Sequence, residues 1–179
     1  MGKLDEARPL YEEALQAQRE TIGDRHANTL ITINNMGVLL YHMGKLEEAR
    51  PLFEEALRAS RETLSDRHAK TLISINNMGR LLQAMSKLEE ARPLLEEVLQ
   101  GRRETLGDRH PDTLVSIVNM GLLLQAMGKL DLAVAYLQEA AQACLETLGS
   151  NHPDTQNAIC GLQMLKAQTG KDKATAAGR

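Results

Sequence analysis

The stretch GKLEEARPL at residues 44–52 decides the fold, because it recurs along the chain at a fixed distance. Similar stretches begin at residues 2, 86 and 128, where the chain reads GKLDEARPL, SKLEEARPL and GKLDLAVAY. Each start lies 42 residues after the one before, and residues 44–85 match residues 86–127 at 30 of 42 positions. A period of 20–50 residues indicates an array of similar structural repeats. We expect one array over residues 1–169, with repeats 2–43, 44–85, 86–127 and 128–169, and a polar, mobile tail at 170–179.

Each repeat contains two helical patterns. Apolar residues in 46–64 and in 71–85 recur at i, i+3, i+4 and i+7, which is the spacing of an amphipathic helix. No stretch keeps the alternation of a strand for long. The pattern predicts an all-α fold, an α-solenoid of antiparallel helix pairs joined by short turns. A proline recurs inside the second helix of three repeats, and we expect it to shape the curvature of that helix without breaking it: these are Pro9, Pro51 and Pro93.

The joint between the two helical patterns of a repeat reads GDRHPDTL at residues 107–114, with related octets at 23–30, 65–72 and 149–156. An acid, a base and a histidine this close suggest a catalytic site, but a catalytic cluster is built once and a structural joint is built in every repeat. We expect a left-handed glycine to end one helix in three of the joints, at Gly23, Gly107 and Gly149. The Asp-Thr pair after the proline is expected to cap the next helix, at residues 112–113 and 154–155.

The joint histidines are the residues most open to a metal-binding interpretation. They lie one repeat apart, and packed helices are already about 8–10 Å apart, so several of them cannot reach one ion. We therefore predict a turn or capping role and no metal site for His26, His68, His110 and His152.

Composition limits the function further. The formal net charge is −3 without long runs of one sign, and the chain has one Phe, three Tyr and no Trp, which argues against a nucleic-acid surface. No apolar run approaches the ~20 residues of a membrane span. No phosphate-binding glycine loop, Cys-x-x-Cys pair or nucleophile turn occurs. The sequence predicts a chain that is not an enzyme and that uses no cofactor.

The two cysteines do not form a disulfide framework, which favours a reducing, cytoplasmic setting. Cys144 occupies the repeat position of Gln18, Ser60 and Arg102, and we expect it to point outward. We expect Cys160 to be a small, half-buried filler.

Residues 33–57, INNMGVLLYHMGKLEEARPLFEEAL, carry a more specific pattern. Met36-Gly37, Leu40, Gly44, Ala49, Phe53 and Ala56 stand where tetratricopeptide repeats have Leu-Gly, an aromatic, Gly, Ala, an aromatic and Ala. The chain resembles that family. Its 42-residue period, its ETLG…HPDT joint and its NNMG stretch are similar to the longer repeats of kinesin light chain and nephrocystin-like arrays. The chain departs from the pattern where leucine replaces an aromatic, at Leu40, Leu82, Leu124 and Leu95.

This resemblance implies a right-handed superhelix whose first helices line a concave groove that binds a partner protein or peptide. One stripe of the first helices is then expected to form the groove: Asn34, Val38, Tyr41, Asn76, Arg80, Gln83, Val118, Leu122 and Gln125. The neighbouring Asn35, Asn77 and Asn119 are expected either to face the groove or to hold the helix to its neighbour.

The chain opens on a second helix, and no first helix covers its apolar stripe. Either the chain is part of a longer array, or this stripe is a self-association face: its residues are Leu4, Ala7, Leu10, Tyr11, Ala14 and Leu15. The favoured function is a protein-interaction scaffold that holds a partner peptide or helix in the groove. The alternatives are a structural, self-associating array (a homo-oligomer through the N-terminal helix) and a regulatory array from a larger signalling protein.

Overall fold

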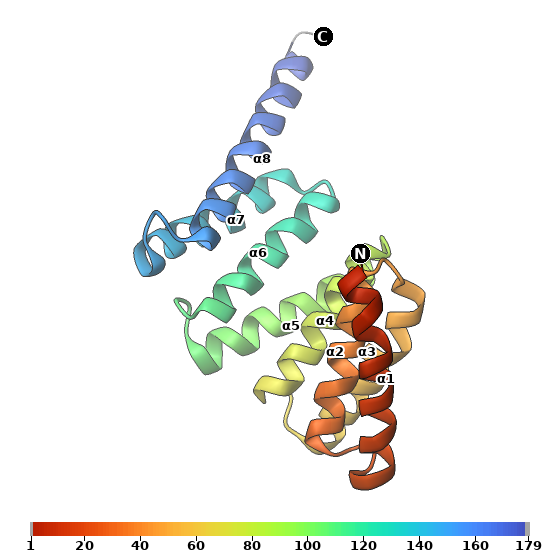
Figure 1. Cartoon of the computed structure of the whole chain (residues 1–179). Coiled ribbons are helices and arrows are strands. Elements are labelled where there is room, and N and C mark those ends of the chain that lie inside the picture. Colours follow the sequence, from red (N-terminus) through yellow and green to blue (C-terminus); the bar gives the residue numbers. More distant parts are fainter. Residues whose placement is uncertain (1, 178–179) are drawn as a thin grey trace. The chain divides into compact units, whose positions relative to one another are not determined.

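The computed structural model describes the backbone of residues 2–177 and the side chains of residues 3–153, 155–156 and 158–167. Over this range the chain forms eight α-helices and no strand (Figure 1). The helices are α1 (Gly2–Ile22), α2 (Ala27–His42), α3 (Leu46–Thr63), α4 (Ala69–Ala84), α5 (Leu88–Leu106), α6 (Pro111–Ala126), α7 (Leu130–Leu148) and α8 (Pro153–Ala177). The predicted all-α fold of paired helices is confirmed.

The chain divides into two compact units, unit 1 at residues 1–94 and unit 2 at residues 95–179, and the boundary falls within α5. In unit 1, α1 packs on α2, α2 on α3 and α3 on α4, and α2 also touches α4. In unit 2, α6 packs on α7 and α7 on α8. Successive helices therefore pair in chain order, as short connections require.

Small residues let the neighbouring helices α2 and α3 approach closely. Ala49 and Ala56 of α3 are fully buried, and Ala56 belongs to a cluster with Leu30 and Ile33 of α2. Leu15 of α1 packs against the same cluster. The alanines leave room for the leucine and isoleucine side chains of the facing helix, so the core is filled by alternating small and large residues.

Proline does not interrupt the second helices. Pro9, Pro51 and Pro93 lie inside α1, α3 and α5, each of which is one continuous helix. At the other end of the chain, α8 continues through residues 170–177, which the sequence assigns to a tail. The backbone of these residues is thus helical, and their mobility stays a prediction. Residues 178–179 of that tail lie outside the described range.

The joints are held by the histidines. The Nδ1 atom of His26 accepts a hydrogen bond from the backbone N–H of Asn28 at 3.2 Å, and His110 accepts one from Asp112 at 3.1 Å. His68 does the same for Lys70. The capping role predicted for these three histidines is confirmed, but the caps expected from Asp112 and Thr113 are not what the structure shows at α6, where the N-cap is His110.

The glycines of the joint adopt the left-handed conformation predicted for them. The φ angles of Gly23, Gly107 and Gly149 are +88°, +86° and +82°. A threonine in the first turn of the next helix connects that helix to the joint. The Oγ1 atom of Thr29 donates a hydrogen bond to the carbonyl oxygen of Gly23 at 2.8 Å. The octet is therefore a helix-to-helix joint.

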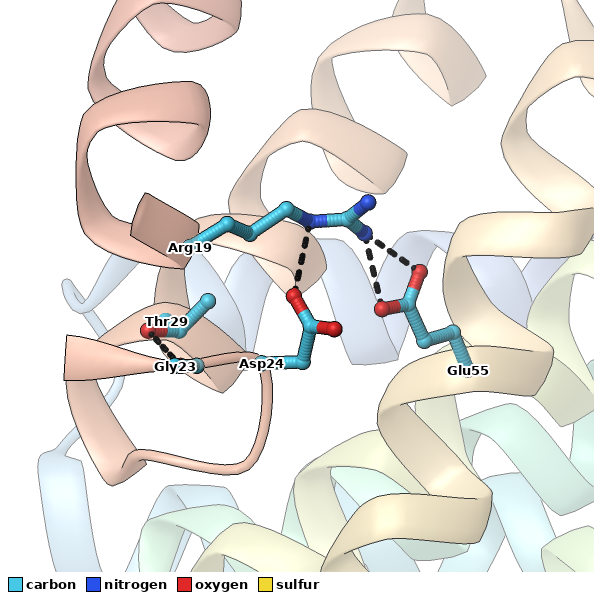
Figure 2. A network of polar contacts seen from close by, with 5 residues as sticks. All are labelled: Arg19, Gly23, Asp24, Thr29 and Glu55. Atoms are coloured by element: carbon cyan, nitrogen blue, oxygen red, sulfur yellow. Dashed lines mark hydrogen bonds and ion pairs between the residues drawn. The ribbon is translucent and has the colours of Figure 1, made fainter. Parts of the chain in front are cut away.

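The acid and the base of the octet also form ion pairs, Asp24 with Arg19 and Arg25 with Glu62. Figure 2 shows Arg19 of α1 between two carboxylates: its Nη2 atom donates to both oxygens of Glu55 of α3 at 2.7 Å, and its Nε atom lies 3.5 Å from Asp24. Arg103 repeats this arrangement in unit 2, with Asp108 and Glu139. The arginine of one second helix thus contacts the next second helix and the joint between them.

Candidate functional site

The first helices of unit 1, α2 and α4, carry exposed or half-buried side chains that the packing does not use; we call this surface the α2–α4 face. Val38 and Tyr41 of α2 and Arg80 of α4 line one small cleft together with Asn77. The guanidinium carbon of Arg80 lies 5.4 Å from the centroid of the Tyr41 ring, a cation–π contact. The cleft is shallow, with a volume of about 10 Å³. Its aromatic ring and its cation suit the backbone and the carboxylate of a peptide that lies across it.

Two residues of the predicted stripe are committed to the packing. Asn34 and Asn76 are 9% and 8% exposed. The Asn34 amide donates to the Oγ atom of Ser74 at 2.9 Å and to the Leu30 carbonyl oxygen at 3.3 Å. Its oxygen accepts from the amide of Asn77 at 3.3 Å. A buried amide with these partners holds α2 to α4, so we leave Asn34 and Asn76 out of the binding surface.

The neighbouring asparagines divide between the two roles that the sequence left open. Asn77 makes the contact to Asn34 and is half-buried, and Asn119 is 9% exposed. Asn35 is exposed. The helix-holding role therefore applies to Asn77, and Asn35 remains available on the surface of α2.

The corresponding surface of unit 2, which we call the α6–α8 face, is more apolar. Leu122 of α6 is 42% exposed, and Val118 and Gln125 are half-buried. On α8, Met164 is 70% exposed. Gln83 of α4 is half-buried in unit 1, at the repeat position of Gln125. The structure thus leaves seven of the nine predicted groove residues at least partly accessible, divided between the faces of the two units.

The expectation for the two cysteines is wrong. Cys144 of α7 is buried, with 3% exposure, and Cys160 of α8 is exposed. The repeat position of Cys144 faces the next first helix, because Ser60 at the same position lies 3.4 Å from Ser74 of α4. The polar residues at this position in the other repeats suggest an outward direction, but Ser60 and Arg102 are buried and Gln18 is half-buried.

Arg102 is the clearest case of a buried polar residue at this position. It is 6% exposed, and its Nη1 atom donates to the backbone oxygen of Asp112 at 2.8 Å and to Ser116 Oγ at 2.9 Å. Burial lowers the pKa of the Arg102 guanidinium, and the charge of Asp112 opposes that shift. The residue at this position varies between otherwise similar repeats. Its contact with the following first helix could not be predicted from the sequence pattern.

The apolar stripe of α1 is partly used inside unit 1. Leu15 packs against the α2–α3 cluster, whereas Leu10 is 67% exposed. Of the remaining residues of the stripe, Leu4, Ala7 and Tyr11 are half-buried and Ala14 is exposed. The stripe is therefore an incomplete apolar surface with Leu10 as its most accessible member.

Two general features bear on the chemistry of the described residues. Among them, no three His, Cys, Asp or Glu side chains are grouped so that they could hold a metal ion. No helix in the described range is long and apolar enough to span a membrane.

The helix pairs recur with a period of 42 residues and are joined by capped turns. Their first helices present a polar or an apolar face. These features define the class of helical-repeat interaction proteins. Models of the tetratricopeptide repeat match residues 1–62, 29–104 and 69–123, and a further one matches residues 113–154. The chain belongs to the tetratricopeptide repeat family. A search of curated proteins found no significant match.

Solved structures with the same fold include kinesin light chain-like arrays. The nearly identical TPR-like repeats of a Podosopora anserina protein, assigned as a kinesin light chain, are 26% identical with a TM-score of 0.82, over 98% of this chain and 83% of that one. BtubC (BKLC) from P. vanneervenii is 21% identical with a TM-score of 0.82, over 98% and 70% of the two chains. Rap protein, solved in complex with the competence and sporulation factor, is 17% identical with a TM-score of 0.79, over 98% and 47%. The resemblance to kinesin light chain arrays is thus supported.

Proposed function

We propose that the chain is a protein-interaction scaffold that binds a peptide or helix of a partner protein on its first-helix faces. The observation that carries this proposal is the cleft of the α2–α4 face, where Val38, Tyr41 and Arg80 converge without being needed for the core. α2 and α4 contain no Asp or Glu, so Arg80 offers its charge to a bound carboxylate without competition from acids on those helices.

Catalysis is not part of the proposal. In the joint after α1, His26 caps α2. The acid and the base beside it form ion pairs with helix side chains, Asp24 with Arg19 and Arg25 with Glu62. A cytoplasmic location belongs to the proposal as well, because Cys144 and Cys160 form no disulfide, as a reducing compartment favours.

The binding proposal is tested by selecting ligands on the whole chain. A random dodecapeptide library is panned against the protein, and the affinity of the enriched peptides is measured by fluorescence anisotropy. We expect Arg80→Ala, Tyr41→Ala or Leu122→Ala to weaken the enriched peptides at least tenfold. Truncation of a residue that anchors a ligand typically costs more than 1 kcal/mol, which is roughly tenfold in affinity.

Arg58→Ala supplies the control, because Arg58 is an exposed arginine of the second helix α3. It removes the same type of side chain from a surface that the proposal does not use. Peptides that lose affinity for Arg58→Ala and not for the three first-helix variants would place the binding surface elsewhere and overturn the proposal.

Self-association through α1 is the second candidate function, and the 67% exposure of Leu10 favours it. Light scattering over a hundredfold range of protein concentration tests it. A mass that grows with concentration, and that returns to 19.8 kDa in Leu10→Glu, would support it. A constant monomer mass would exclude it for this chain.

A further inference from the structure

Unit 2 contains a cavity of about 340 Å³ that opens on the α6–α8 face. Its walls come from the two first helices, α6 and α8, and its floor from the second helix between them, α7. Val115 and Leu122 at its mouth are 48% and 42% exposed, while Cys144 on the floor is 3% exposed. The cavity therefore runs from an accessible apolar rim to a buried floor, and its volume lies near the lower end of ligand pockets, about 300–1,000 Å³.

The described residues that line the cavity are uncharged. Of these eleven residues none is Asp, Glu, Lys, Arg or His, and the only polar side chains are those of Asn119 and Cys144. A charged group placed there would lose its hydration without gaining a partner, whereas an aliphatic group would not. The described part of the lining thus favours an uncharged, apolar occupant.

Three substitutions within the repeat produce this chemistry. Gly161 stands where the other repeats have Asn35, Asn77 and Asn119, and a Cβ atom added at Gly161 would meet nothing within 4 Å. Ala158 stands at the position of Ser74 and Ser116. Cys144 stands at the position of Ser60 and Arg102. The last repeat has therefore lost an amide, a hydroxyl and a more polar group from one place, and the space they would occupy is open.

The equivalent cavity of unit 1 shows what these polar residues do. It lies between α2, α3 and α4, has a volume of about 240 Å³, and is lined by Arg25, Lys70, Asn34, Asn35 and Ser60 among others. Its wall also includes Leu30, Ile31 and Ile73, so it offers two cations beside an apolar surface. At the same repeat position in α5, Arg102 donates to the backbone oxygen of Asp112 and to Ser116 Oγ of α6. The second helix thus supplies Ser60, Arg102 or Cys144 at this position, and the polarity beside the following first helix changes with it.

We propose that the α6–α8 cavity is an anchor site for aliphatic side chains, leucine, isoleucine or methionine, of a partner protein segment. This inference rests on the proposed function and names the chemistry of the partner. The occupant follows from the uncharged lining and from the continuity of the cavity with the α6–α8 face, where Leu122 and Met164 extend the apolar surface. A partner segment that lies along this face brings its side chains directly over the cavity mouth.

Gly161→Asn is the test variant, because it restores the residue of the other repeats and places an amide in the cavity where a Cβ has room. Cys160→Asn is its matched control: it introduces the same residue one position earlier, on an exposed site that does not line the cavity. A second variant, Cys144→Arg combined with Ala158→Ser, reproduces the Arg102–Ser116 pair of α5 and α6 and fills the cavity from its floor. Thermal melting of each variant checks that the fold is retained.

The probes are the dodecapeptides enriched on the unmodified chain. We expect a subset to share aliphatic residues, to bind Gly161→Asn and the filled variant at least tenfold more weakly, and to bind Cys160→Asn unchanged. In a Cys160→Ser background Cys144 is the sole thiol, and these peptides should slow its modification by N-ethylmaleimide at least fivefold.

Two results would overturn the inference, and they differ in what they imply for the proposed function. If enriched peptides bind Gly161→Asn as well as the unmodified chain and leave Cys144 unprotected, the cavity is not an anchor site, while the scaffold function stands. If no peptide is enriched on the unmodified chain, the scaffold proposal fails and the anchor site fails with it.

Discussion

Gly37 of α2 lies directly against the ring of Phe53 of α3. A Cβ atom added to Gly37 would come within 2.6 Å of Cε1 and 2.9 Å of Cδ1 of that ring. Phe53 is 1% exposed, so its ring has no free space into which it can move. Gly121 repeats the contact in unit 2, where an added Cβ would lie 2.9 Å from Leu137 Cδ2. The first helix therefore needs glycine at this position, because the following second helix packs too closely for a Cβ atom.

Gly37→Ala should lower the free energy of unfolding by about 1–3 kcal/mol, the usual cost of forcing extra volume into a packed core. Urea denaturation followed by circular dichroism measures it. The matched control is Gly161→Ala, because its Cβ meets nothing within 4 Å. Alanine is the better helix former by about 1 kcal/mol, so this control should be neutral or stabilising. Equal losses for the two variants would contradict the close-contact explanation.

Ser86 holds the left-handed conformation, with φ of +60°, at the turn between α4 and α5. Glycine stands at the same turn in the neighbouring repeats, where Gly44 and Gly128 have φ of +74° and +73°. The left-handed region costs a residue with a side chain about 1–2 kcal/mol, partly offset by the greater unfolded-state entropy of glycine. Ser86→Gly should therefore raise the free energy of unfolding by about 0.5–1 kcal/mol.

The reverse change, Gly128→Ser, is the companion experiment. A Cβ at Gly128 meets nothing within 4 Å, so the substitution changes only the backbone preference. We expect a loss of similar size in thermal and urea unfolding. A Gly128→Ser variant as stable as the parent would show that the turn relaxes to another conformation.

His110 caps α6 through its Nδ1 atom, which accepts from the Asp112 N–H at 3.1 Å. His110→Ala leaves that N–H without its acceptor and should cost about 1 kcal/mol, as the loss of an N-cap typically does. His110→Asp supplies a carboxylate oxygen and should keep most of the stability, because Asp is among the best N-cap residues. If the Asp variant melts as low as the Ala variant, the histidine acts through something other than the cap.

Arg102 is buried against acceptors that carry no charge. Taking a charge out of water costs free energy, as the lowered pKa of this arginine reflects. Arg102→Met keeps most of the volume and removes the charge, and Ser116 Oγ retains its bond to the Asp112 carbonyl oxygen. We expect the free energy of unfolding to be unchanged or higher in this variant. Arg102→Ala should instead lower the free energy of unfolding by about 2 kcal/mol or more, because it creates a cavity. A large loss for Arg102→Met as well would mean that the hydrogen bonds of Arg102 stabilise the fold by more than the burial of its charge costs.

Arg19 bridges α1 and α3 through Glu55, but its side chain is 39% exposed. Arg19→Met should therefore lower the unfolding free energy by less than about 1 kcal/mol, and the difference should shrink in 1 M salt. Urea unfolding at low and high salt measures both effects. A larger loss that persists at high salt would indicate that the packing of the side chain, rather than its charge, holds the two helices.

Helical spacing predicts which groove residues share a stripe, but not which of them a neighbouring helix covers. Val38, Tyr41 and Arg80 were placed on one surface by helical spacing, and the structure brings them to one cleft. Asn34 was placed on the same stripe, but it is buried against α4. Spacing along one helix indicates which residues share a stripe. It does not tell how far the neighbouring helix covers the edge of that stripe.

The sequence by itself determined the all-α class, the 42-residue period and the helix pairs, because helical spacing can be read within one repeat. It also determined the left-handed glycines at three joints and the structural role of the joint histidines. These features depend on residues close together in the chain, and the same local patterns recur in each repeat. The tertiary structure decided the burial of Cys144, the inward direction of Arg102 and the open cavity beside Gly161. Each of these depends on how a second helix packs against the first helix that follows it in the chain. The sequence pattern identifies both helices but does not show how closely they meet.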